Sequence, residues 1–334
     1  MKPDVEKQPI SRKGGGQVVA LCGGVGGAKL AAGLARVLGQ DLTVVVNTGD
    51  DFEHLGLLVS PDLDTVLYTL GGVANKEVGW GRADESWNFM EALGHLGGQT
   101  WFRLGDRDLA LHVQRTHQLR SGRTLTDFMH EAAQSHGIAA RILPMCDDPI
   151  RTMVATSEGY LPFQRYFVER RCEPQINGIV FEGKDKARPS AQVLAALQAP
   201  DLRAVIICPS NPFLSIDPIL ATPGIRPLLE QVKAPVIAVS PIIGGAAVKG
   251  PTTKIMAELG IPATSRAIAQ HYSGLLHGLV IDDVDVAERD TIGGLTHVAP
   301  TLMKSDGDRE RLAREVLAFA DGIASNPAMT RATR

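Results

Sequence analysis

The sequence is poor in the features that mark several common protein classes. Its 334 residues include 4 cysteines, none in Cys-x-x-Cys spacing, so neither a zinc site nor a disulfide framework is indicated, and we expect buried, reduced thiols. No apolar run reaches the roughly 18 residues that a membrane span needs, and residues 1–16 lack the apolar segment of a signal peptide. We therefore expect a cytoplasmic protein with no membrane partner.

An excess of charge of one sign is also missing. The chain has 34 basic and 37 acidic residues and a formal net charge of -3, so it lacks the global positive field that nonspecific nucleic-acid binding needs. We expect no nucleic-acid partner, and local positive groups that hold a small anion are the better expectation. Two catalytic signatures are absent as well, the Gly-x-Ser-x-Gly elbow and the His-Glu-x-x-His helix.

The composition that remains, 44% hydrophobic and 21% charged, is ordinary for a globular protein with a substantial core. Several short apolar, β-branched runs lack polar alternation, which is typical of parallel strands covered on both faces. Helical patterns separate or follow them, so we predict an α/β fold with a doubly wound, mainly parallel, Rossmann-like sheet. The predicted strands are residues 18–22, 41–46, 203–208, 235–240 and 278–282, and two of the helices are residues 227–232 and 309–319.

The domain organisation follows from where this pattern is interrupted. We predict a disordered tail over residues 1–16, a single α/β domain over 17–325 and a second tail over 326–334. A mostly helical capping lobe is inserted at about residues 75–180, and its first part carries all three tryptophans, Trp80, Trp87 and Trp101. From 142 to 181 apolar and polar residues alternate, for example at 151–156 and 166–168, which indicates antiparallel strands or an inserted lobe.

The first predicted strand runs into a glycine-rich turn, Gly23, Gly24, Val25, Gly26 and Gly27, and then into an Ala-rich helix. Glycines let backbone N–H groups approach a ligand closely, and the helix adds unpaired amides and a positive dipole end, so a phosphate is the natural guest. The turn lacks both the Gly-Lys-Ser/Thr ending of a P-loop and a cleanly spaced Rossmann acid. A plain tight turn is the alternative.

Other polar loops follow the predicted parallel strands, and ligands bind beyond the carboxyl ends of such strands. Carboxylates beside a phosphate loop repel the ligand unless a cation lies between them, so clustered aspartates predict Mg²⁺. The alternative is that Asp62 caps a helix and that Asp50 or Asp51 satisfies turn amides. No histidine is firmly tied to these acids. The candidate residues are Asn47, Thr48, Asp50, Asp51, Asp62, Asp64, Ser210, Asn211, Gly244, Gly245 and Lys249.

Seven motifs together, each weak alone, resemble one family in order and spacing. They are Gly23-Gly24-Val25-Gly26-Gly27, Asn47-Thr48-Gly49-Asp50-Asp51, Ser60-Pro61-Asp62-Leu63-Asp64-Thr65, Leu104-Gly105-Asp106-Arg107-Asp108, Pro144-Met145-Cys146-Asp147-Asp148, Pro209-Ser210-Asn211-Pro212 and Ser240-Pro241-Ile242-Ile243-Gly244. From residue 18 to 303 the chain is similar to the 2-phospho-L-lactate transferases (CofD and FbiA). The resemblance implies a coenzyme F(420) enzyme in which the deazaflavin Fo attacks a GDP-activated phospholactate, phosphoenolpyruvate or phosphoglycerate and GMP leaves.

The resemblance also implies roles for single residues. Asp50 and Asp64 match the family's metal and Fo-side acids, which makes them the catalytic and Mg²⁺-binding candidates, and Arg103 falls near the Fo site. Gly245 and Lys249 stand where family members differ, so the resemblance leaves open which acyl group the donor carries. We also expect a homodimer.

Two other functions stay open at this point. A related family with the same glycine-rich loop binds nucleotide sugars and regulates cell-wall metabolism, which would make this chain a binding protein. An NAD(P)-dependent oxidoreductase rests on the glycines alone, because Asn47 rather than a ribose-binding acid follows the second strand.

Overall fold

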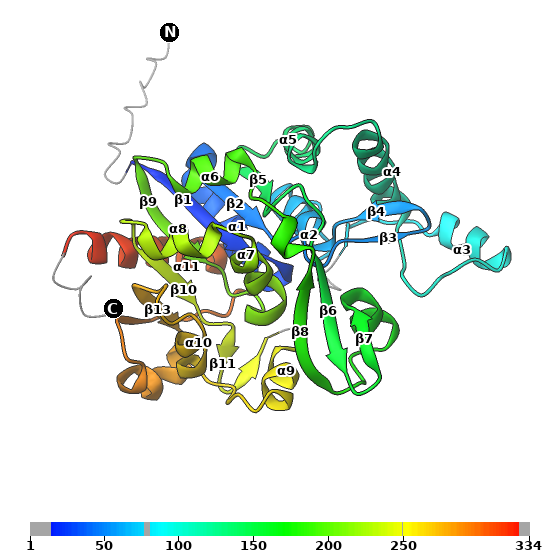
Figure 1. Cartoon of the computed structure of the whole chain (residues 1–334). Helices are drawn as coiled ribbons and strands as arrows, with labels where there is room; N and C mark the ends of the chain where they lie inside the picture. The colour runs from blue at the N-terminus through cyan, green and yellow to red at the C-terminus, as the bar shows by residue number, and fades with distance from the viewer. Residues whose placement is uncertain (1–14, 77–80, 249, 327–334) are drawn as a thin grey trace, which may run out of the picture.

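A parallel β-sheet lies at the centre of the computed structural model, which describes residues 15–76, 81–248 and 250–326 (Figure 1). Within those residues the sheet has seven strands in the order β14-β13-β10-β9-β1-β2-β5, and every neighbouring pair is parallel. The prediction of a parallel, doubly wound α/β fold is confirmed. The strands are β1 (Gln17–Cys22), β2 (Leu42–Val46), β5 (Arg141–Pro144), β9 (Leu202–Ile207), β10 (Val236–Val239), β13 (Gly278–Ile281) and β14 (Thr296–Val298).

The direction in which the chain builds the sheet reverses between β1 and β9. From β1 the chain adds β2 and β5 on one side, and it later returns to add β9, β10, β13 and β14 on the other. At such a reversal the loops that leave the two adjacent strands diverge to opposite faces and open a crevice at their carboxyl ends. The loops that leave β1 and β9 are the ones that carry the glycine-rich turn and Ser210.

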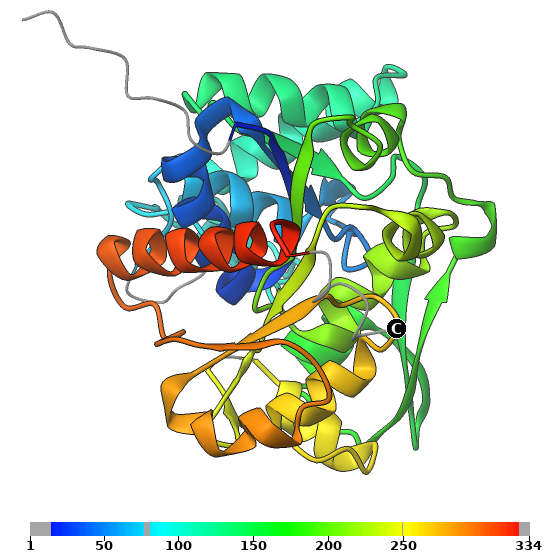
Figure 2. The same cartoon turned by 90° about the vertical axis from the view of Figure 1, so that its left-hand side faces the viewer.

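Helices cover both faces of this sheet because the strands are apolar on both sides. Val18 and Ala20 of β1 pack with the helices of one face, and Val19 and Leu21 pack with those of the other. In Figure 2, α11, in red, lies in front of the strands of the sheet. One face is covered by α1 (Gly24–Leu38), α2 (Pro61–Leu70), α5 (Leu125–Ser135) and α11 (Asp306–Ala324), and the other by α6 (Ala191–Leu197), α7 (Asp217–Ala221), α8 (Ile225–Gln231), α9 (Thr252–Glu258) and α10 (Ser265–His271).

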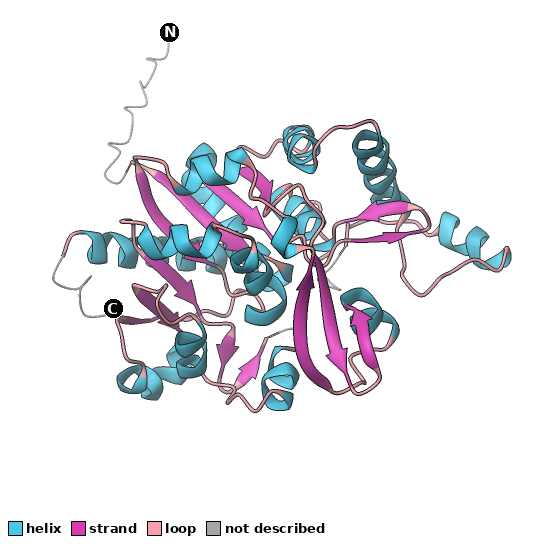
Figure 3. Ribbon diagram, viewed as in Figure 1, coloured by secondary structure: helices cyan, strands magenta, loops and turns pink. Residues whose placement is uncertain are grey.

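Two excursions fill the range predicted as one inserted lobe. The helices α3 (Asn88–His95) and α4 (Asp106–Arg120) form the first, and an antiparallel sheet in the order β7-β6-β8 forms the second (Figure 3). Between them the chain returns through α5 and β5, and β5 pairs with β2 of the central sheet. β5 (Arg141–Pro144) overlaps the start of the range 142–181, which was predicted to form antiparallel strands or an inserted lobe, and it instead forms a parallel strand of the central sheet. The antiparallel strands are β6 (Arg151–Thr156), β7 (Gly159–Pro162) and β8 (Ile176–Glu182).

Residues 166–168, whose alternation indicated a strand, instead lie in a helical segment, Arg165–Glu169. Phe163 and Tyr166 are both buried and stand three residues apart, which is the spacing of a helix face. A three-residue run is too short for its period to distinguish helix from strand. No helix in the described part of the chain is both long and apolar enough to cross a membrane.

The chain also forms two short hairpins outside the central sheet. The first joins β3 (Phe52–His54) to β4 (Leu57–Val59) and packs on α4. The second joins β11 (Ile242–Ile243) to β12 (Ala246–Ala247). Gly244 and Gly245 form the turn of the second hairpin with φ of +57° and +76°, the pair of positive angles that a tight two-residue hairpin turn requires.

Candidate functional site

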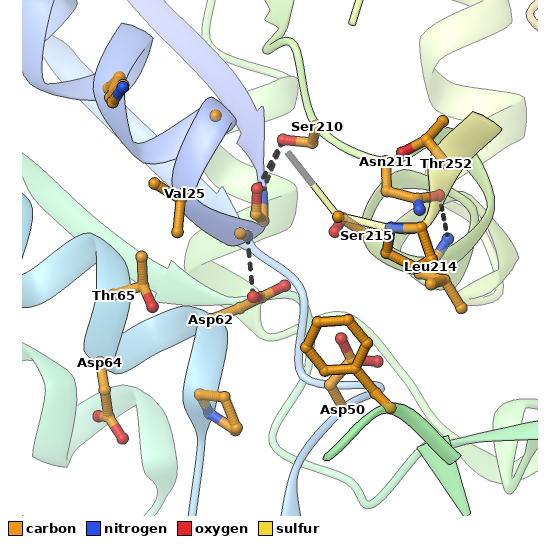
Figure 4. A pocket seen from close by; sticks show the side chains of 18 of the residues that line it. Val25, Asp50, Asp62, Asp64, Thr65, Ser210, Asn211, Leu214, Ser215 and Thr252 are labelled. Atoms are coloured by element: carbon orange, nitrogen blue, oxygen red, sulfur yellow. Dashed lines mark hydrogen bonds between the residues drawn. The ribbon is translucent and has the colours of Figure 1, made fainter. Parts of the chain in front are cut away.

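A pocket of about 710 Å³ opens at the reversal point of the sheet, where its floor is the glycine-rich turn and its walls come from both excursions. Figure 4 shows Asp62 between the start of α1 and Asp50, and it shows Asn211 on the side of the pocket away from Thr65 and Asp64. Ten predicted residues line this pocket: Gly23, Gly24, Val25, Gly26, Asp50, Asp62, Asp64, Arg103, Ser210 and Asn211. Six predicted residues do not line it: Gly27, Asn47, Thr48, Asp51, Gly244 and Gly245. Lys249 lies outside the described residues.

The glycine-rich turn is the start of α1, with Gly23 as its N-cap residue. Val25 and Gly26 belong to the first helical turn, whose N–H groups have no carbonyl partner within the helix, and both residues line the pocket. A Cβ on Gly26 would lie 2.6 Å from the carbonyl oxygen of Pro209, and Gly24 has φ of +61°. The glycines are therefore required by close packing against the β9 loop as well as by the approach of a ligand.

Two side chains of the β9 loop complete the floor of the pocket. Ser210 Oγ donates to Gly23 O at 2.7 Å and accepts from Gly23 N at 3.1 Å, which ties the two loops together. Asn211 Oδ1 accepts from the backbone N–H groups of Phe213 and Leu214, at 3.0 and 3.1 Å. The Nδ2 atom of Asn211 is buried and has no partner in the described structure, and Asn211 lines the pocket, so its N–H donors are the unused hydrogen-bonding groups of this loop.

Both carboxylate oxygens of Asp62 accept hydrogen bonds from within the protein. Its Oδ1 accepts from Gly24 N at 2.8 Å and its Oδ2 accepts from Asn47 Nδ2 at 2.9 Å. Burial raises the pKa of Asp62 to about 6, and these two hydrogen bonds oppose the rise. Asp62 therefore caps a helix, as the alternative supposed. Asp62 lies in the first turn of α2, but the helix that it caps is α1. Asn47 holds Asp62 in place.

Asp50 has weaker support: the larger effect of burial on the pKa of its carboxyl is opposed only by the nearby side chains of Thr152 and Asn47. It is buried and lines the pocket, and its Oδ1 atom has no hydrogen-bond partner in the described residues. Burial, and next the charge of Asp62, raise the pKa of Asp50 well above its ordinary value. A buried carboxylate oxygen without a partner fits a bound cation, because the cation removes the cost of burying the charge.

Asp64 has a cationic partner that the sequence analysis missed. Arg115 of α4 is wholly buried, and it donates from Nη2 to Asp64 Oδ1 and from Nη1 to Asp64 Oδ2. His112 Nδ1 lies 3.7 Å from Asp64 Oδ2, which is too long for a hydrogen bond, so this histidine stands beside Asp64 without being firmly tied to it. Burial raises the pKa of Asp64, and the charge of Arg115 opposes the rise.

The contacts around Asp64 extend along α4. His112 Nε2 lies 3.2 Å from Asp108 Oδ2, and Tyr68 donates its hydroxyl to Asp108 Oδ1 at 2.6 Å. Asp64, Asp108 and His112 are the one described group of three whose possible metal-ligand atoms lie within 4.8 Å of one another. The i, i+4 spacing of Asp108 and His112, followed by Arg115 three residues on, is the sequence signal that could have revealed this helix face.

Part of the pocket wall is aromatic. Trp101, Phe102, Phe163 and Phe167 line the pocket there. Arg103 also lines it, and its guanidinium stands 4.2 Å from the ring of Trp87, which does not line it. Trp80, the first of the three tryptophans in the predicted capping lobe, lies outside the described residues.

The raised pKa of Asp51 leads to a prediction about stability. Burial raises it from 3.8 to about 7, so the folded protein holds this proton more tightly than the unfolded chain does. The stabilisation from the proton is complete below about pH 4 and is lost as the pH rises through about 7. Asp51→Asn should therefore raise the melting temperature more at about pH 8 than at about pH 5. Thermal unfolding in EDTA measures the difference, and an equal shift at both values would contradict the assignment.

Comparisons with known proteins agree on one family. A family model described as 2-phospho-L-lactate transferase CofD matches residues 18–313. A phosphoenolpyruvate transferase of Streptomyces griseus is 40% identical over 317 residues, which cover 92% of this chain and 99% of that protein. A 2-phospho-L-lactate transferase of Methanosarcina mazei is 39% identical over 304 residues, 90% of this chain and 99% of that protein.

Among solved structures, a crystal structure of a UPF0052 family member from Bacillus halodurans superposes with a TM-score of 0.59 at 15% sequence identity. The match covers 90% of this chain and 98% of that one. At this identity the likeness shows the shared fold alone.

Proposed function

The chain belongs to the 2-phospho-L-lactate transferase CofD family, a family of phospholactyl-type transferases in coenzyme F(420) biosynthesis, and on this basis we propose the reaction that its pocket performs. A phospholactyl, phosphoenolpyruvyl or phosphoglyceryl group passes from a GDP-activated donor to the terminal ribityl hydroxyl of Fo, and GMP leaves. The observation that supports the proposal is Asp50, a buried carboxylate with one unpartnered oxygen, which lines the same pocket as the first-turn residues Val25 and Gly26.

The two ends of the pocket fit the two substrates. The amides of Val25 and Gly26 and the Nδ2 group of Asn211 are donors suited to a diphosphate, so the nucleotide part of the donor lies at this end. The aromatic wall around Trp101 and Phe163 suits the flat deazaflavin ring. The diphosphate then lies between the amides and the aspartates, close to both.

We propose that Asp50 and Asp64 hold the Mg²⁺. Asp50 offers the oxygen without a partner, and each Asp64 oxygen accepts one N–H from Arg115 and keeps a further lone pair. Bound there, Mg²⁺ neutralises charge on the transferring phosphoryl group. Calorimetric titration of Mg²⁺ in the presence of GDP should give binding that Asp50→Asn removes. Unchanged binding would exclude this residue as a ligand.

The protein's own part in the reaction is positioning. The first-turn amides and Asn211 orient the donor phosphates, and the aromatic wall brings the Fo hydroxyl to the phosphorus that carries the acyl group. Phosphoryl transfer through a loose transition state leaves a general base little to do early in the step. We therefore propose direct attack by the hydroxyl, with no covalent enzyme intermediate.

Alanine substitution of Asn211 should raise the KM for the donor more than the KM for Fo. The substitution removes the unpartnered Nδ2 donor, together with the hydrogen bonds that Oδ1 accepts from Phe213 and Leu214, and none of the aromatic lining residues is changed. We expect the KM for the donor to rise about ten-fold, which corresponds to the loss of one hydrogen bond to a charged group. Steady-state kinetics with each substrate varied in turn makes the measurement, and an equal rise in both KM values would contradict the placement.

Fo should quench the fluorescence of Trp101, because this indole lies in the pocket wall. In Trp87→Phe, which removes a tryptophan outside the pocket, the quenching should persist. In Trp101→Phe it should be largely lost. If saturating Fo still quenches the fluorescence fully in Trp101→Phe, the deazaflavin ring does not lie beside Trp101.

A ligand screen separates this function from the two alternatives. By thermal shift, GDP or Fo should stabilise the protein, whereas a nucleotide sugar would indicate the regulator and NAD(P) the oxidoreductase.

A further inference from the structure

Arg115 is a buried charge that the proposed chemistry does not use directly. Its side chain is fully buried on α4, and it does not line the pocket. It stands behind Asp64, which does line the pocket, and donates to both carboxylate oxygens. Burying an arginine in this way is costly unless its donors are used, and a bidentate pair with a carboxylate uses them with fixed geometry.

The remaining contacts of Arg115 hold the guanidinium itself in place. Its Nη1 lies 3.2 Å from Leu58 O in β4 and 3.3 Å from His112 Nδ1. With Arg115 as the donor, His112 Nδ1 is the acceptor, so its proton is on Nε2, which faces Asp108 at 3.2 Å. The hydroxyl of Tyr68 holds the other Asp108 oxygen. The contacts of the group come from α2, α4 and β4, and among the described residues Arg115 Nε and His112 Nε2 have no hydrogen-bond partner.

These contacts use much of the ligand capacity of Asp108 and His112, because Tyr68 donates to Asp108 and His112 Nδ1 accepts from Arg115. Asp64 accepts one N–H of Arg115 on each oxygen and keeps a further lone pair on each. What the group leaves available is the pocket-facing side of Asp64. Its orientation is set from behind by a residue that a substrate does not touch.

We propose that Arg115 is a positioning residue for Asp64: it fixes the direction in which that carboxylate faces the pocket, and it acts on the reaction through Asp64 alone. This inference rests on the transferase function proposed above. It predicts that Arg115 and Asp64 behave as one unit, so that losing the second adds little once the first is gone.

The test is a double-mutant cycle of Arg115→Lys and Asp64→Asn, with product formation followed long enough to measure slow variants. Lysine keeps the buried charge but cannot make the bidentate pair. We expect Arg115→Lys to lower kcat about ten-fold or more in the native background and by less than about two-fold in the Asp64→Asn background. Melting temperatures are measured alongside, and the loss of kcat should persist at temperatures where Arg115→Lys is fully folded.

Arg123→Lys is the matched control, because Arg123 pairs with Glu131 at the surface and should show no effect in either background. Native kcat in Arg115→Lys, or a loss of equal size in both backgrounds, would overturn the inference. Failure of the wild-type protein to turn over Fo would instead refute the proposed function. The cycle would then be read in the calorimetric affinity for Mg²⁺ with GDP, with the same non-additive result expected.

Discussion

Asp50→Asn lowers kcat by about a hundred-fold or more, yet it leaves the protein folded with an equal or higher melting temperature. The loss is expected because the buried Oδ1 of Asp50 has no hydrogen-bond partner in the described residues, and we propose that it binds the cation. A loss of about this size is typical when one electrostatic contact to the reacting group is removed. The gain in stability is expected because burial disfavours the charged carboxylate, as its raised pKa shows.

Steady-state kinetics at saturating Mg²⁺ and thermal unfolding of the same preparation measure both effects. Asp185→Asn is the control, since Asp185 is an exposed carboxylate in the short helix Lys184–Lys186 and should change neither. Near-normal turnover in Asp50→Asn would remove this residue from the site. A large fall in melting temperature would show that it supports the fold instead.

Gly26→Ala abolishes detectable GDP binding, because the added methyl group forces the first turn of α1 away from its position. The new Cβ would lie 2.6 Å from Pro209 O, a backbone atom that no side-chain rotation can move. The amides of Val25 and Gly26 would then be displaced from the phosphates, and a shift of this kind disrupts several hydrogen bonds at once. Calorimetric titration with GDP measures the loss, with the melting temperature as a check on folding.

Gly322→Ala is the matched control, since nothing lies within 4 Å of a Cβ at that position of α11. In a helix this change should leave GDP binding unaltered and stabilise slightly. GDP affinity in Gly26→Ala equal to that of the wild type would make the glycine-rich turn an ordinary tight turn.

The sheet and the loops at its carboxyl edge could be predicted from the sequence, because buried parallel strands leave a strong apolar signal. The runs at 41–46 and 203–208 became β2 and β9 within one or two residues. β14 has three half-buried residues and carries no such run, so its place at the sheet edge depends on pairing with β13. A strand of this kind is specified by its neighbours rather than by its own pattern.

The site was predicted in part for a similar reason. Residues in loops after strands, such as Asp50 and Ser210, are found from their place in the pattern, because the fold dictates where those loops meet. Arg115 was missed because a charged residue in a polar helix is usually solvated. Its burial depends on Asp64, which is 51 residues away, and on Leu58 of the adjacent hairpin. Long-range pairs of this kind are not visible in local sequence patterns.

The measurement that tests the central claim most directly is the mass of the product formed from a GDP-activated donor and Fo by the purified protein with Mg²⁺. Donors that carry lactate, enolpyruvate and glycerate are supplied separately, and GMP and the phosphodiester of Fo are quantified together. We expect equal amounts of GMP and phosphodiester with at least one donor, and no GMP when Fo is left out. GMP released without Fo, a phosphorylated or acylated protein trapped from the donor alone, or no phosphodiester with any donor would contradict it.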